Sequence, residues 1–123
     1  MSGDNIVVDT SLIINLFNGS AEVQRLITGR TLFVSVISEI EVLSFPQLTD
    51  NDRSLIKDFL SECYIVDIEQ AVKDITIQIR AKYKTKLPDA VIAATALYFD
   101  MPLFTMDKGF NKIVDLQSVI LAI

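Results

Sequence analysis

Two aspartates follow short apolar segments that are typical of buried strands. Asp9 comes directly after the segment 6–8, and Asp107 comes two residues after the segment 103–105. In open parallel sheets, ligands bind beyond the carboxyl ends of the strands, so both side chains are expected on the ligand-binding side. Asp9 has a second interpretation, because aspartate is also a favoured capping residue at the start of a helix. Both residues are therefore candidates for acid–base or metal chemistry, with structural roles as the alternative.

A third aspartate and a pair of glutamates lie in predicted helices. Asp89 follows Pro88 and precedes an apolar segment, so it marks the place where a buried helix meets a cleft. The helix dipole alone would also explain it, since a carboxylate in the first turn gains about 0.3–1 kcal/mol. Glu39 and Glu41 lie on opposite flanks of one apolar helical stripe. Periodicity does not choose between them, and each taken singly reads as a solvated glutamate.

Carboxylate chemistry is favoured because other catalytic side chains are missing. The chain has no histidine and a single cysteine, Cys63. This excludes histidine acid–base catalysis, Ser-His-Asp and Cys-His triads, and zinc sites built from histidine and cysteine. With 16 acidic and 11 basic residues the net charge is −5, which by itself argues against binding a polyanion.

The composition predicts a single domain, residues 1–123, with a continuous core, because half of its residues are hydrophobic. One cysteine rules out an internal disulfide, and Cys63 is interpreted as a buried, inert thiol in a reducing, cytoplasmic setting. The apolar stretch 90–99 contains Thr95 and is too short to span a bilayer as a helix. We expect no signal peptide and no membrane association.

Strand and helix patterns alternate along the chain. Strands are predicted over 5–8, 31–34, 64–66 and 103–104 and around 113–114. The predicted helices cover 11–17, 20–27, 36–43, 50–62, 69–83 and 88–99, the last with Pro88 at its first position. Buried strands that alternate with helices indicate a parallel sheet covered on both faces, which is an α/β fold.

Four blocks of the sequence, in this order, resemble the motifs of PIN-domain ribonucleases. They cover residues 6–13, 35–43, 87–96 and 103–110, and each contributes one carboxylate. Each motif is weak alone, but their order and spacing over nearly the whole chain are specific. The spacing of the second block selects Glu41 over Glu39. The length is similar to that of VapC-type toxins from bacteria and archaea.

The resemblance implies a three-layer α/β/α sandwich with strand order 3-2-1-4-5, in which Asp9 lies beside the strand that leads to Asp107. It also implies a metal-dependent endoribonuclease that hydrolyses RNA phosphodiester bonds as the toxin of a type II toxin–antitoxin pair. The catalytic residues and ligands of Mg²⁺ or Mn²⁺ would be Asp9, Glu41, Asp89 and Asp107. Ser11 or Thr105 would help to orient them. The implied partners are an RNA substrate, an antitoxin protein and a second copy in a homodimer, with the apolar end 119–123 at an interface or in the core.

The negative net charge is compatible with an RNA substrate if divalent cations bind where the phosphate must lie. Basic residues are also concentrated near the second half of the predicted site. Seven of the 11 lie in this stretch: Lys73, Arg80, Lys82, Lys84, Lys86, Lys108 and Lys112. Tyr83 among them has two interpretations, a platform for an RNA base or a core residue.

Several other functions remain to be weighed. A PIN nuclease of RNA processing or decay outside a toxin pair would have the same sequence features, and a gene for an antitoxin next to this one would separate the two. A non-catalytic α/β binding or signalling domain is the third possibility. A receiver-like domain is disfavoured because no acidic pair follows the first strand. A haloacid-dehalogenase-type phosphatase is disfavoured because Ser11, two residues after Asp9, is not acidic.

Overall fold

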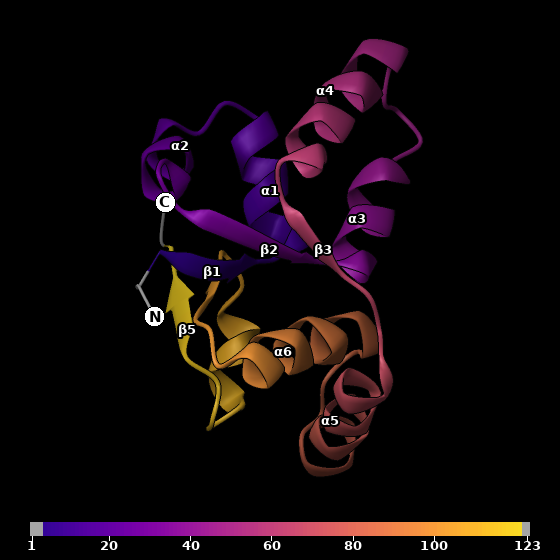
Figure 1. Ribbon diagram of the computed structural model, residues 1–123, viewed down its shortest axis with the longest axis vertical. Helices are drawn as coiled ribbons and strands as arrows, with labels where there is room; N and C mark the ends of the chain where they lie inside the picture. Colours follow the sequence, from indigo (N-terminus) through magenta and orange to yellow (C-terminus); the bar gives the residue numbers. More distant parts are fainter. Residues whose placement is uncertain (1–3, 122–123) are drawn as a thin grey trace.

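The computed structural model describes residues 4–121, which form a five-stranded parallel sheet. The strand order is β3-β2-β1-β4-β5, which confirms the predicted order. The strands are β1 (Asn5–Val8), β2 (Thr31–Ser35), β3 (Tyr64–Val66), β4 (Leu103–Thr105) and β5 (Ser118–Ile120). The chain therefore enters at the centre of the sheet and moves outward, first to one edge and then to the other (Figure 1).

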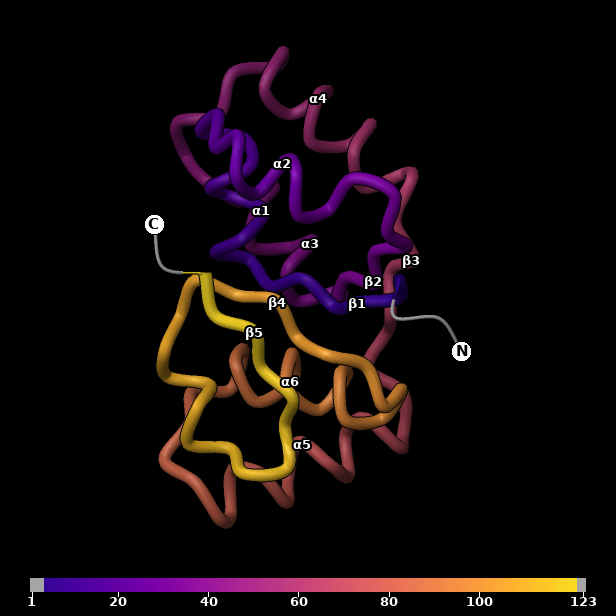
Figure 2. The backbone as a smooth tube through the Cα atoms, turned by 90° about the vertical axis from the view of Figure 1, so that its left-hand side faces the viewer, coloured from indigo at the N-terminus to yellow at the C-terminus, as the bar shows by residue number. Residues whose placement is uncertain are grey.

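Helices cover both faces of the sheet, as predicted (Figure 1). One layer contains α1 (Thr10–Phe17), α2 (Ala21–Ile27), α3 (Val36–Leu43) and α4 (Asp50–Ser61). The other layer contains α5 (Gln70–Lys82) and α6 (Leu87–Phe99), which pack closely against each other. In Figure 2 the chain after β4 runs along the α5–α6 side of the molecule before it returns as β5. No helix within residues 4–121 is long and apolar enough to span a membrane.

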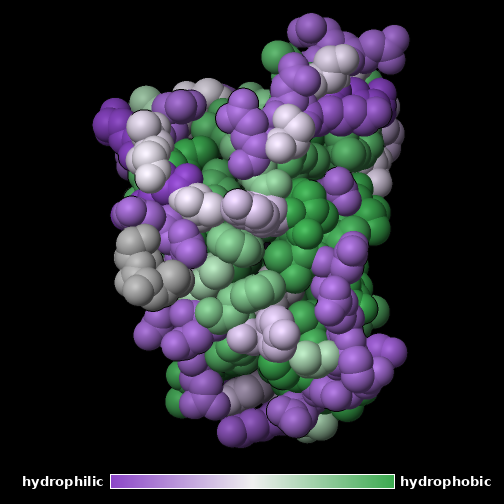
Figure 3. Space-filling view, in the orientation of Figure 1, coloured by the Kyte–Doolittle hydropathy of each residue, from purple (hydrophilic) through white to green (hydrophobic). Residues whose placement is uncertain are grey.

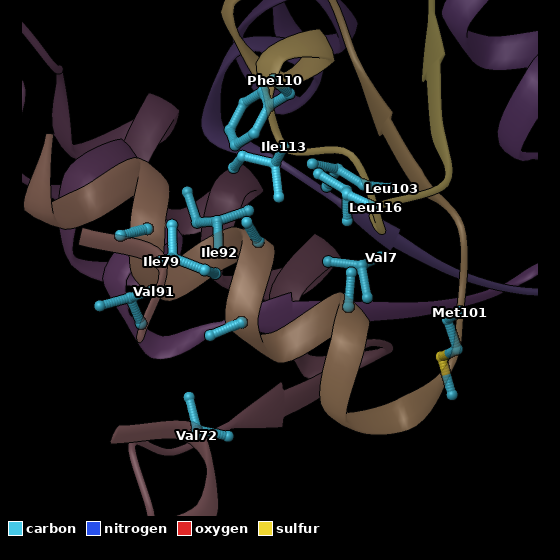
Figure 4. Packing of buried hydrophobic residues seen from close by; sticks show 14 residues of the cluster. Val7, Val72, Ile79, Val91, Ile92, Met101, Leu103, Phe110, Ile113 and Leu116 are labelled. Atoms are coloured by element: carbon cyan, nitrogen blue, oxygen red, sulfur yellow. The ribbon is translucent and has the colours of Figure 1, made fainter. Parts of the chain in front are cut away.

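The central strands β1 and β4 are mostly apolar because both faces of the sheet are buried there. Ile6 and Val8 belong to the core under α1–α4, whereas Val7 between them belongs to the core under α5 and α6. Leu103 and Phe104 divide in the same way. Figure 4 shows the second of these cores, where side chains of β1, β4, α5 and α6 meet those that follow β4.

Side-chain caps mark the residues at which several helices begin. Ser20 accepts a hydrogen bond from the Val23 amide at the start of α2. Thr49 and Asp52 form a reciprocal capping box at the start of α4. These caps fix where each helix begins, and so they limit the possible placements of the strands that follow.

Two sequence predictions were wrong in position. Residues 113–114 are not a strand, because the buried side chain of Ile113 anchors the end of a short 3-10 helix, η1 (Lys108–Lys112). The fifth strand lies further along, over Ser118–Ile120, where the backbone pairs with β4. Pro88 is the second residue of α6, not the first. Of the apolar end 119–123, residues 122–123 lie outside the described part of the structure.

Candidate active site

Asp9 lies at the carboxyl end of β1, and its side chain is only 4% exposed. It caps α1, since its Oδ1 atom accepts a hydrogen bond from the Leu12 amide at 3.0 Å. The Ser11 hydroxyl lies 2.8 and 2.9 Å from the two carboxylate oxygens. Thr105 Oγ1 donates to Oδ2 at 2.5 Å. Asp9 is therefore a helix cap and also a carboxylate held rigidly at a strand end.

Hydroxyl groups connect Asp9 to the end of β4. The pairing of Val8 with Phe104 places the two strand ends side by side. Thr105 Oγ1, which donates to Asp9, accepts a hydrogen bond from the Asp107 amide at 2.9 Å. Ser11 Oγ likewise accepts from the Met106 amide at 3.1 Å. The two hydroxyls thus fix the backbone that carries Asp107 relative to Asp9.

Asp107 caps η1 and is exposed. Its Oδ1 atom accepts a hydrogen bond from the Gly109 amide at 2.8 Å. A Cβ atom added to Gly109 would lie 3.1 Å from Oδ1, closer than ordinary contact distance. Glycine at position 109 therefore lets the backbone approach the carboxylate.

Glu41 and Glu39 lie in different environments. Glu41 Oε1 accepts a hydrogen bond from Thr10 Oγ1 at 2.6 Å, and Thr10 is the neighbour of Asp9. Thr10 Oγ1 also lies 3.0 Å from the hydroxyl of the buried Ser38. Glu39 instead lines a groove with Lys57 and Leu60 of α4. The structure therefore brings Glu41, and not Glu39, toward the end of β1.

Asp89 is the third residue of α6, and the topology explains its position. Only residues 100–102 connect α6 to β4, so the end of α6 lies near the start of β4. The beginning of α6 must then lie near the carboxyl ends of the strands. Asp89 is half-buried, and no protein group within residues 4–121 donates a hydrogen bond to its carboxylate.

The electrostatics link the four carboxylates. Burial raises the pKa of Asp89 above its ordinary value, and the negative charges of Asp107 and Glu41 raise it further, against a smaller opposite effect of Lys86 and Lys112. Burial is also the main cause of the raised pKa of Asp9. Hydrogen bonds from Thr105, Leu12 and Ser11 oppose this shift, and the charge of Asp107 adds to it. Ionisation at this end of the sheet is therefore electrostatically unfavourable in the metal-free protein.

The model of the PIN domain family matches residues 6–116. The chain belongs to the PIN-domain family. Among curated proteins, no sequence matches it significantly. A chain of the toxin–antitoxin complex from Klebsiella pneumoniae is 29% identical, with a TM-score of 0.82, over 93% of this chain and 95% of that one.

Two further solved structures share the fold at lower identity. VapBC2 from Rickettsia felis, bound to a DNA fragment from its promoter, matches with a TM-score of 0.85 and 18% identity over 96% of this chain and 99% of that one. DNA-bound VapBC from Salmonella typhimurium matches with a TM-score of 0.83 and 19% identity over 94% and 97% of the two chains. The PIN domain is a nuclease fold, and PIN domains in general depend on divalent metal ions.

The carboxylates of this PIN domain match a metal site in chemistry but do not form a closed cage. Hard divalent cations prefer oxygen ligands, and all four side chains supply carboxylate oxygens. Within residues 4–121, however, no three of the acidic or cysteine side chains are close enough together to hold an ion directly. Mg²⁺ usually keeps several water ligands, so an open set of carboxylates suits it better than a closed cage does.

Two polar residues of this PIN domain were not singled out from the sequence. Thr10 and Ser38 lie beside Glu41, and their hydroxyl groups join α1 to α3. Hydroxyl side chains are common at helix starts, so their types carry no signal of a contact made 28 or 31 residues away. A search for large cavities would not identify the four carboxylates either. A cavity of about 460 Å³ lies between α1, α2 and α4, and none of the four lines it.

The structure gives Tyr83 and Cys63 structural environments. The Tyr83 ring packs against the core under α5 and α6, and its hydroxyl accepts a hydrogen bond from the Val114 amide at 3.3 Å. These contacts favour the interpretation of Tyr83 as a core residue. Burial, followed by the charge of Glu62, raises the pKa of Cys63 to about 11. A thiol with this pKa remains protonated at neutral pH, as expected for an inert cysteine.

Proposed function

We propose that this PIN domain is a metal-dependent endoribonuclease that hydrolyses RNA phosphodiester bonds. One observation carries the proposal: Asp9, Glu41, Asp89 and Asp107 come from four separate segments and influence one another electrostatically at the carboxyl end of the sheet. A purely structural role would not require four acidic groups there, because two like charges 4 Å apart repel by about 4 kcal/mol at an effective dielectric of 20. All four are proposed as catalytic residues and metal ligands.

Hydrogen bonds from neighbouring groups hold three of the four carboxylates in this mechanism. Thr105 and Ser11 hold the two oxygens of Asp9, and the Gly109 amide holds Asp107. Thr10 holds Glu41. Mg²⁺ or Mn²⁺ bound there would supply charge neutralisation at the scissile phosphate and a water of lowered pKa. The chain itself contributes a rigid carboxylate pair at β1 and β4 and the more loosely held Asp89.

Cleavage assays on several RNAs test this function directly. The purified protein should cleave RNA in Mg²⁺ or Mn²⁺ and lose activity in excess chelator. Asp107→Asn should abolish cleavage, whereas Glu39→Gln on the same helix as Glu41 should retain it, because Glu39 lies beside α4. Undiminished cleavage by metal-stripped protein would contradict the mechanism, and full activity of Asp107→Asn would remove that residue from the site.

We also propose that the nuclease is the toxin of a type II pair and that its partner is an antitoxin. The support is the family together with the likeness to a chain of the Klebsiella pneumoniae toxin–antitoxin complex. The toxin would act in the cytoplasm on cellular RNA. Expression should stop growth, and co-expression with the product of the adjacent gene should restore it and yield a complex. Growth that is unaffected by the nuclease would instead favour a role in RNA processing or decay.

The proposed assembly is a homodimer of one PIN domain, residues 1–123, per chain. Apolar side chains are exposed on several elements, among them Ile40, Tyr64 and Leu87. In Figure 3, hydrophobic residues gather across the middle of one face, between hydrophilic regions above and below. Burying such residues in an interface would remove apolar surface from water. Light scattering that shows only monomer at high protein concentration would contradict the dimer.

A further inference from the structure

Two lysines on separate segments of the chain lie at the end of α6 that carries Asp89. Lys86 precedes α6, and Lys112 ends η1. Lys86 lies three residues before Asp89, and Lys112 Nζ donates a hydrogen bond to the backbone carbonyl of Lys84, which places its ammonium group at the turn before α6. Both are exposed, and Lys86 makes no side-chain cap to α6. Two positive charges therefore border the carboxylates.

The two segments are held together by contacts that leave the lysine charges free. Lys112 Nζ donates to the backbone carbonyl of Lys84 at 2.5 Å, which uses only one of its three N–H groups. The Tyr83 hydroxyl bonds to the Val114 amide, and Arg80 Nε donates to the Thr85 carbonyl at 3.3 Å. The turn between α5 and α6 is thus fixed against the chain that follows η1. The spacing of Lys86 and Lys112 is set by the fold.

Neither of the two lysines is neutralised by an ion pair within residues 4–121. The chain has an excess of acidic residues, yet within residues 4–121 the structure has one ion pair, between Arg53 and Asp50 of α4. Lys86 and Lys112 have no carboxylate within ion-pair distance in that part of the chain. Cations in this position are suited to a second anion that lies across the acidic site.

We propose that Lys86 and Lys112 bind two backbone phosphates of single-stranded RNA and so set the direction in which the strand crosses the site. The inference rests on the proposed nuclease function and specifies its substrate contacts. A single strand of RNA carries anionic groups at regular intervals, one for the metal-bound position and others for the lysines. The lysines contact phosphate and not bases, so they contribute affinity without sequence preference.

Salt-dependent binding measures these contacts without relying on cleavage. Fluorescence anisotropy of a labelled 12-nucleotide oligouridylate would be followed with the full chain in Ca²⁺ as KCl is varied. Each phosphate contact on a single strand contributes about 0.7 to the slope of log K against log [salt], which is about fivefold in affinity per tenfold change in salt. Lys86→Gln and Lys112→Gln should each reduce the slope by about 0.7, and the double variant by about 1.4.

Matched controls separate charge from structure. Lys57→Gln in α4 changes net charge equally but should leave the slope unchanged, because α4 belongs to the helix layer on the opposite face of the sheet from α6. Lys112→Arg keeps the charge and should retain the wild-type slope. Arginine and glutamine both keep an N–H donor for the Lys84 carbonyl, so a merely structural role of Lys112 would predict the wild-type slope in both variants. Slopes that are the same in wild type, Lys86→Gln and Lys112→Gln would overturn the inference. The wild-type protein could also bind RNA with this salt dependence and yet fail to cleave it in Mn²⁺. That result would contradict the proposed nuclease activity but still support the phosphate contacts.

Discussion

Asp89 differs from Asp9 in what holds its carboxylate. Asp9 accepts hydrogen bonds from a helix amide and two hydroxyl groups, so replacing it disturbs α1 and β4 as well as the charge. Asp89 accepts no hydrogen bond from the described protein groups, and its pKa is raised by burial and by neighbouring negative charge. A substitution of Asp89 is therefore the best test of whether a carboxylate serves catalysis or the stability of the fold.

Asp89→Asn should abolish cleavage and leave the metal-free protein equally stable or more stable by up to about 1 kcal/mol. The pKa of Asp89 in the folded protein lies above its ordinary value of 3.8, so folding favours the protonated form. Its contribution to stability is complete below the unfolded pKa and is lost as pH rises through the folded pKa. Thermal unfolding in chelator should thus show an advantage of Asn at pH 7 that shrinks toward pH 3.

The opposite result is that Asp89→Asn lowers the free energy of unfolding by about 0.3–1 kcal/mol and retains cleavage. It would show that Asp89 only interacts favourably with the helix dipole. Glu39→Gln is the control for removing one negative charge elsewhere, since Glu39 lies in the groove with Lys57.

Thr10 positions Glu41 through one hydrogen bond of 2.6 Å. A hydrogen bond to a charged group contributes about 1.5–3 kcal/mol, so Thr10→Val should raise the Mn²⁺ concentration needed for half-maximal cleavage by about tenfold or more. Thr10→Ser keeps the hydroxyl and should restore the wild-type metal dependence. Metal titrations of cleavage rate would measure both, and equal behaviour of the valine and serine variants would show that the hydroxyl does not orient Glu41.

The 3-10 helix η1 determines where Asp107 lies, because its first turn begins at that residue. Gly109→Ala would place a Cβ atom 3.1 Å from Asp107 Oδ1, and the carboxylate must then move by a few tenths of an ångström. Misplacing a reacting group by about 1 Å can cost about 100-fold in rate, so a several-fold loss of cleavage is expected. The melting temperature should change little, because Gly109 is exposed.

Gly29→Ala is a suitable comparison for Gly109→Ala. Gly29 follows α2 with a positive φ of 81°, and nothing lies within 4 Å of its added Cβ. The Gly29→Ala substitution should lower the free energy of unfolding through backbone strain and leave cleavage intact. A result in which Gly109→Ala lowers stability but not activity would show that η1 does not position Asp107 for the reaction.

The molecule as a whole collects negative charge at the carboxyl end of its sheet, so a bound cation should stabilise the folded state. Free metal at 100 times its dissociation constant would add about 2.7 kcal/mol. Melting curves should show a clear increase with Mn²⁺ for wild type and Glu39→Gln, and a much smaller one for Glu41→Gln, Asp89→Asn and Asp107→Asn. Equal increases in all of these proteins would mean that the carboxylates do not share one ion.

The order of strands and helices was predictable because both signals are local. A few consecutive residues are enough to recognise an apolar strand that is buried on two faces, such as 6–8. The same is true of a helix with one apolar stripe. The fifth strand was misplaced because strand pairing at a sheet edge depends on a distant partner. The strand Ser118–Ile120 pairs with β4. The predicted segment 113–114 is also apolar, but its Ile113 packs in the core with α6. A short apolar segment carries the same local pattern in either place.

The sequence by itself determined the fold class, the family resemblance and the four acidic candidates, since residue type and order along the chain are sufficient for these. The tertiary structure decided which groups act together. It joined Thr10 to Glu41, placed Glu39 beside α4, and brought Lys112 of η1 to the turn between α5 and α6. These relations are between residues on different elements, and their distances depend on how helices pack on the sheet. Helical periodicity gives Glu39 and Glu41 equivalent positions, and only packing against α1 and α4 makes them different.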